Sequence, residues 1–122
     1  MNITEALAEL KARPDFAQHV GMTLIHNGTV RAWSRQDRRV VSAIEVTPDL
    51  AHIERLRQEF LQKDGIYDII IDAKNGILKP GDDLLYIIVA GDIREHVTPV
   101  LAALLDRIKS EAVIKREVIS PT

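Results

Sequence analysis

The chain has 122 residues, of which 46% are apolar, a formal net charge of −2 and no cysteine, and its length suits one domain spanning 1–122. The composition excludes disulfides and thiolate metal sites, the slightly acidic charge argues against a general nucleic-acid binder, and no apolar run reaches the about 20 residues that span a bilayer. The N-terminus carries charges every few residues, unlike a secretory signal, and together with the missing cysteines this favours a cytoplasmic protein with no membrane contact.

The first third of the chain predicts one helix and two strands. Residues 2–12 have an apolar face at helical spacing and begin with a capping-box pattern. Residues 20–32 alternate in the manner of a strand, and residues 40–46 form a second apolar strand. Because the polar segment 33–39 between them resembles a loop, we expect the two strands to pair as a hairpin.

A helix and two buried strands are expected in the middle of the chain. The helix spans about 49–63 and is closed by Asp64-Gly65, where glycine supplies the left-handed residue after a helix end. Residues 66–73 and 83–90 are nearly continuous apolar runs, which predicts strands that are central or covered on both faces. Glycine, proline, asparagine and aspartate between these runs, at 75–82, mark turns.

The C-terminal segment predicts a helix that leads into a short strand. Thr98-Pro99 is a good helix start, because threonine can cap free N–H groups and proline suits the first helical position. Apolar residues then recur every three or four positions up to Ala112, and residues 113–117 follow as a strand. The predicted order is therefore α-β-β-α-β-β-α-β, an α+β fold with a mainly antiparallel sheet and flanking helices.

Two lysines near the end of this segment are candidates for chemistry. Lys109 lies at the edge of the apolar stripe of the helix, and Lys115 lies on the strand that follows. They could face one pocket, as an anion site or as an amine held near a reactive carbonyl. The alternative is two solvated lysines at a helix end, where cations suit the helix dipole.

Several arginines form a second group of candidates. Gly28-Thr29-Val30-Arg31 could be a bend that aims Arg31 into a cleft to bind phosphate or carboxylate, or a hairpin bulge with an exposed arginine. Arg94, at a strand-to-helix junction, could bind an anion or pair with a neighbouring acid. Three loop arginines could steer a phosphate or simply keep the loop soluble: Arg35, Arg38 and Arg39.

The histidines give no sign of a metal site. His19, His26, His52 and His96 are scattered, and no pair has metal-ligand spacing. Each is therefore expected to be a surface or structural residue, and we expect no metal and no resident cofactor.

Taken together, the spacing of these elements resembles that of a known family. The elements are Gly28-Thr29-Val30-Arg31, then Arg94 at a strand end, then Asp106-Arg107-Ile108-Lys109, then Lys115-Arg116-Glu117, with a G-x-L-x-x-G-D turn at 76–82. In this order they resemble the MoaE-type family, the large, catalytic subunit of molybdopterin synthase. The chain departs from the family pattern at Ile93, where the family has histidine, and at Ile114, where it has tryptophan.

The resemblance implies an α/β hammerhead fold and a sulfurtransferase of molybdenum cofactor biosynthesis. Its large subunit forms a homodimer within a heterotetramer, and each copy binds a small ubiquitin-like sulfur carrier. The carrier's C-terminal Gly-Gly thiocarboxylate supplies two sulfurs to cyclic pyranopterin monophosphate. By this resemblance Lys109 and Lys115 belong to the reacting centre, Arg94 could reach across the dimer, and substrate is bound by Thr29, Val30, Arg31, Ile93, Arg94, Arg116 and Glu117.

Two other functions remain open at the level of sequence. A non-catalytic relative would keep the fold and the dimer and bind a carrier tail or a pterin phosphate without chemistry. An unrelated α+β nucleotide-binding module is a weaker alternative, because the glycine spacing and the Lys-Ser/Thr pair of a phosphate loop are missing.

Overall fold

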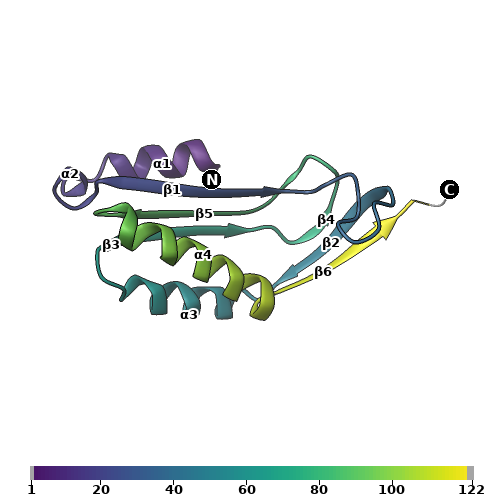
Figure 1. The fold of residues 1–122 in the computed structure, drawn as a ribbon. Coiled ribbons are helices and arrows are strands. Elements are labelled where there is room, and N and C mark those ends of the chain that lie inside the picture. Colours follow the sequence, from purple (N-terminus) through teal and green to yellow (C-terminus); the bar gives the residue numbers. More distant parts are fainter. Residues whose placement is uncertain (1, 121–122) are drawn as a thin grey trace.

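The computed structural model describes residues 2–120, which form two antiparallel three-stranded sheets with helices around the first (Figure 1). The first sheet has the order β1 (Met22–Thr29), β5 (Asp83–Gly91) and β3 (Ile66–Ala73). Because β5 pairs with both neighbours along most of its length, it is the central strand. The predicted α+β class with antiparallel strands is confirmed.

The second sheet is smaller and lies beyond one end of the first (Figure 1). Its central strand β2 (Val41–Pro48) pairs with β4 (Gly76–Leu78) on one side and β6 (Val113–Ile119) on the other. Strand β4 was predicted only as a turn region, because three residues are too few to show an alternating pattern.

Helices cover both faces of the first sheet. The longest, α4 (Arg94–Glu111), lies with α3 (Leu50–Leu61) on one face, and α1 (Ile3–Lys11) lies on the other (Figure 1). A short helix α2 (Phe16–His19), which periodicity did not predict, follows α1. None of the helices in residues 2–120 is both long enough and apolar enough to cross a membrane.

The alternation along β5 explains its continuous apolar sequence. Leu85, Ile87 and Val89 point to the core beneath α3 and α4, and the residues between them point to the core beneath α1. Both sets are buried, so a strand covered on both faces needs apolar residues at every position. Strand β3, with a similar sequence, is also covered on both faces, although it lies at the edge of the sheet.

The predicted hairpin of β1 and β2 is wrong. The two strands belong to different sheets, and an isolated antiparallel bridge pairs Trp33 with Val40 in the segment that connects them. The pairing of β1 with β5 shifts register at Gly28 and Thr29, and the backbone of Val30 then bonds to residues 81 and 82 instead. The chain therefore leaves the first sheet at this point and carries Arg31 toward the second.

The predicted start of α4 at Thr98-Pro99 is also wrong. The helix begins at Arg94, and the carbonyl of Ile93 accepts the first bonds from the N–H groups of His96 and Val97. Pro99 lies inside the helix, where its missing N–H leaves the carbonyl of Glu95 without its usual partner. One lost bond near a helix start is outweighed by burial of the apolar face of α4.

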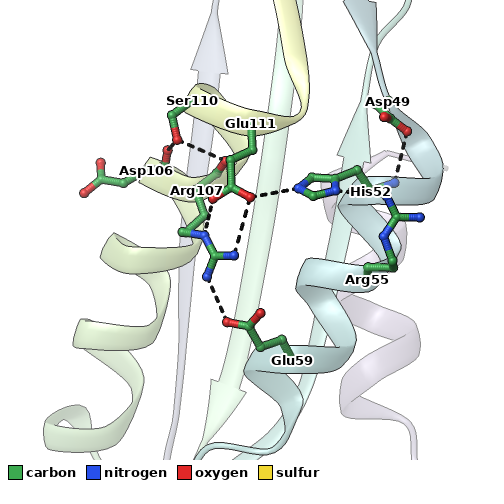
Figure 2. A network of polar contacts seen from close by, with 8 residues as sticks. All are labelled: Asp49, His52, Arg55, Glu59, Asp106, Arg107, Ser110 and Glu111. Carbon is green, nitrogen blue, oxygen red and sulfur yellow. Dashed lines mark hydrogen bonds and ion pairs between the residues drawn. The ribbon is translucent and has the colours of Figure 1, made fainter.

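A polar network joins the C-terminal part of α4 to α3 (Figure 2). Arg107 donates to Glu111 on its own helix and to Glu59 on α3, with 2.8 Å between Arg107 Nη1 and Glu59 Oε2. His52 of α3 lies 2.9 Å from Glu111, and the Asp49 side chain caps α3 at the His52 N–H. The hydrogen bond to Arg107 lowers the pKa of Glu111, so this carboxylate stays ionised and holds the last turn of α4 in place.

Candidate active site

A cavity of about 400 Å³ lies where the last turn of α4 meets both sheets. Its walls come from the ends of β1 and β3, the start of β5, the last turn of α4, and the inner faces of β2 and β6. The floor is apolar, with side chains from Ile44, Val46, Ala73, Leu84, Leu85 and Val113. The polar side chains of the wall are His26, Thr29, Arg31, Lys74, Lys109, Lys115 and Glu117.

Lys109 and Lys115 both line this cavity, as the hypothesis that they face one pocket requires. Ile108 of α4 is completely buried in the core, and this fixes the rotation of the helix so that Lys109, in the last turn, comes to the cavity edge. Alternation along β6 then puts Lys115 and Glu117 on the same inner face, since they pair with the buried Val46 and Ile44 of β2.

The positive charges at the site repel one another, which makes the protonated form of Lys115 less favourable. Burial lowers the pKa of Lys115 below its ordinary value, and the positive charges of Arg31 and Lys109 lower it further. Glu117 opposes this effect. The Lys115 amine therefore loses its proton more readily than a solvated lysine does, which suits an amine beside a reactive carbonyl.

Arg31 lines the cavity and has one donor that no described residue accepts. Its guanidinium lies 5.1 Å from the ring centre of Trp33, a cation–π contact. Its Nε atom is buried and makes no hydrogen bond to any part of residues 2–120. A buried donor without an acceptor is costly, so this nitrogen is a candidate donor to an anionic oxygen.

The segment between β1 and β2 supports the outer wall. Ser34 is buried, and its hydroxyl donates to the Glu117 carboxylate at 3.3 Å. Arg38 has a positive φ of 63° and lies 4.3 Å from the ring centre of Trp33, and Arg39 pairs with Asp37 at 2.7 Å. Neither arginine lines the cavity.

Arg35 is likewise absent from the cavity wall, although its charge contributes to the lowered pKa of Lys115. Phosphate steering by the three arginines of this segment stays a prediction.

Four predicted substrate-binding residues do not line the cavity of their own chain. Val30 is a core residue beneath the second sheet. Arg116 points to the opposite face of β6 and pairs with Glu45 at 2.6 Å, because adjacent residues on a strand face opposite sides. Ile93 and Arg94 lie at the first turn of α4, about 22 Å along the helix from Lys109 at 1.5 Å per residue.

The side chain of Arg94 is 85% exposed, and its nearest acid is Glu95 at 3.8 Å. A contact of Arg94 with the site of a second copy stays a prediction.

Two polar residues of the cavity were not among the predicted site residues, and His26 was expected to be a surface or structural residue. His26 follows Met22 and Leu24 on one face of β1, and those two residues pack on the core under α4. The alternation of β1 was a signal that His26 faces the same side. Lys74, which follows the end of β3, also lines the cavity and pairs with Asp72 at 2.7 Å. Nothing in its local sequence distinguishes it from a turn lysine.

No cluster of three or more histidine, aspartate or glutamate side chains in residues 2–120 could hold a metal ion. The cavity instead combines four basic side chains with one carboxylate and an apolar floor. This arrangement can bind an anionic organic molecule that has an apolar part, and it can stabilise negative charge that develops beside it.

Comparison with known proteins links this architecture to one family. The family model described as MoaE protein matches residues 2–111, a range that includes Arg31 and Lys109 but stops before Lys115. No curated protein matches the sequence.

Solved structures match over nearly the whole chain. Molybdopterin synthase from Staphylococcus aureus superimposes with a TM-score of 0.79 at 18% identity, covering 99% of this chain and 88% of that one. Molybdopterin cofactor biosynthesis protein E from Burkholderia multivorans ATCC 17616 gives 0.75 at 22%, covering 100% and 86%. A complex of subunits 1 and 2 of molybdopterin-converting factor from Helicobacter pylori 26695 gives 0.71 at 14%, covering 99% and 82%. At these identities the likeness concerns the fold.

Proposed function

This chain belongs to the MoaE protein family, and from that premise we propose that it is the large subunit of molybdopterin synthase, acting in molybdenum cofactor biosynthesis. The reaction transfers sulfur from a thiocarboxylated small carrier subunit to cyclic pyranopterin monophosphate. The observation that carries the proposal is the convergence of Lys109, Lys115 and Arg31 on one cavity.

The cavity matches the chemistry of both substrates. Arg31 offers a buried, unpaired donor to the pterin phosphate, and the apolar floor suits the flat ring system. The carrier's thiocarboxylate is an anion, so the ammonium of Lys109 favours its entry and holds its sulfur near the acceptor carbon. Lys115, whose pKa is lowered, stabilises the oxygen of the carrier's last carbonyl group or exchanges a proton there.

The partner and the assembly belong to the same proposal. We infer that the extended Gly-Gly end of a small carrier enters the cavity, and the Helicobacter pylori neighbour is a complex of two different subunits. We expect a homodimer of this chain with one carrier bound to each copy, in which Arg94 of one copy could reach the site of the other.

The test is sulfur transfer from purified thiocarboxylated carrier to cyclic pyranopterin monophosphate, with the product identified by mass. Lys109→Ala is expected to reduce the rate at least about 100-fold, because it removes a charge aimed at the reacting atoms. Lys11→Ala is the matched control, since Lys11 is an exposed lysine of α1 outside the cavity.

Full activity of Lys109→Ala would refute the catalytic assignment. Tight binding of carrier and pterin by the wild-type protein without any sulfur transfer would instead indicate a non-catalytic binding protein.

A further inference from the structure

His26 is a cavity residue to which the function proposed above gives no task. It lies on β1 opposite Ile87 of β5, on the face that contacts the core under α4. Its Nε2 atom lies over Gly28, where a Cβ atom would approach it to 3.0 Å. The missing side chain of Gly28 therefore leaves space for the imidazole at the cavity wall.

The surroundings of His26 keep its ring neutral. The charged groups that face the cavity are Arg31 after β1, Lys74 after β3, Lys109 on α4, and Lys115 and Glu117 on β6. Burial lowers the pKa of His26, and the positive charge of Lys109 lowers it further. At neutral pH the imidazole is therefore free to accept a proton, which a protonated lysine or arginine cannot do.

Sulfur transfer from a thiocarboxylate requires such an acceptor. When the thiocarboxylate sulfur bonds to the pterin carbon, the sulfur is joined to both molecules as a thioester. The carrier can leave only if an oxygen replaces the sulfur on its terminal carbonyl carbon, and water is the source of that oxygen. Water is a poor nucleophile unless a base removes a proton as it attacks.

We propose that His26 is the general base for the water that releases the sulfur-bearing pterin from the carrier, an inference that rests on the proposed function. The water oxygen bonds to the carrier's carbonyl carbon while one water proton moves to His26. The carbon–sulfur bond then breaks, and its electron pair leaves with the sulfur as a thiolate beside Lys109. The carrier is left as a carboxylic acid, which ionises, and His26 returns its proton to solvent.

The proposed step uses the neutral imidazole of His26 together with the two lysines of the cavity. His26 and Lys109 contact the same cavity, so the base and the cation that receives the thiolate can both act on a molecule bound there. Lys115 remains available to stabilise the negative oxygen of the tetrahedral intermediate. His26 thereby has a task that begins only after the first carbon–sulfur bond to the pterin has formed.

The experiment is a single-turnover reaction followed by intact mass, which separates the free carrier from the carrier joined to the pterin. His26→Phe preserves a flat ring of similar size and removes the proton acceptor, and His26→Gln preserves a hydrogen-bonding end group. Both variants are expected to accumulate the joined species and to release the carrier about 100-fold more slowly. His19→Phe is the matched control, because His19 stacks on Tyr67 and lies outside the cavity.

The pH dependence gives an independent measurement. Since the neutral imidazole is the active form, the wild-type release rate is expected to fall as the pH drops through the lowered pKa of His26. This acidic limb should be absent in His26→Gln, which remains a valid test if His26→Phe does not fold. Wild-type release rates and an unchanged acidic limb in the folded variants would overturn the role of His26 alone. Absence of sulfur transfer in the wild-type protein would overturn the proposed function together with it.

Discussion

Asp68 on β3 is expected to be a main polar contributor to the stability of the first sheet. Its carboxylate accepts from Arg13 Nη1 at 2.6 Å, from Arg57 Nη2 at 2.9 Å, and from the N–H of Ile69 at 2.7 Å. Arg13 follows α1 and Arg57 belongs to α3, so one side chain links the elements on both faces of the sheet. The Asp68→Ala substitution removes all three bonds at once.

The size of the effect follows from the exposure of the three partners. The Asp68 side chain is 13% exposed, and the side chains of Arg57 and Arg13 are 25% and 37% exposed. A hydrogen bond to a charged group is worth about 1.5–3 kcal/mol when shielded and below about 1 kcal/mol when solvated. The bond from Arg57 should be worth about the lower shielded value, and the bond from Arg13 about the solvated value. We therefore expect Asp68→Ala to lower the free energy of unfolding by about 2–3 kcal/mol.

Asp72→Ala is the matched control on the same strand. Asp72 pairs with Lys74, and their side chains are 34% and 40% exposed, so its loss should cost less than about 1 kcal/mol. Urea unfolding monitored by circular dichroism gives both values, and a double-mutant cycle with Arg57→Ala isolates the Asp68–Arg57 pair. A cost for Asp68→Ala no larger than that for Asp72→Ala would refute the reasoning.

Two further predictions concern Lys115 of the cavity wall and Ile108 in the core of α4. Lys115→Met should raise the free energy of unfolding at pH 7, because the unfolded chain binds the lysine proton more tightly than the native site does. This gain in stability should shrink as the pH rises from the lowered native pKa toward the ordinary 10.5. Urea unfolding midpoints that show a loss of stability at both pH 7 and pH 10 would contradict the prediction. Ile108→Ala should lower the free energy of unfolding by about 2–5 kcal/mol and Ile108→Val by about 0.5–1.5 kcal/mol, because Ile108 is completely buried. Equal losses for the two variants in urea unfolding would show that α4 does not depend on this contact.

Periodicity predicted the elements that are long and strongly patterned. Strands β3 and β5 and helix α3 occur close to their expected residues, since their apolar runs are buried as continuous faces. The Asn2 cap of α1 is also confirmed, because its side chain accepts from the N–H of Glu5 at 2.8 Å. These features depend on neighbours within a few residues of one another, which a sequence displays directly.

The errors concern features that depend on distant parts of the chain. Strand β1 was expected to pair with β2, but β5 offers a longer apolar partner, and no local pattern records that preference. The early start of α4 depends on burial of Val97 against the sheet, which outweighs a proline inside the helix. Local signals therefore indicated where turns and caps are possible without deciding which of them are used.

Some features of the candidate site were visible in the sequence, and others depend on the tertiary structure. The sequence alone indicated the α+β class, the arginine at 31, and the pair Lys109 and Lys115, because residue type and spacing carry that information. Only the tertiary structure decided that these cations share one cavity, that Arg116 faces away from it and that His26 belongs to it. The reason is that strand alternation and helix rotation give each side chain a direction only after the apolar faces have packed.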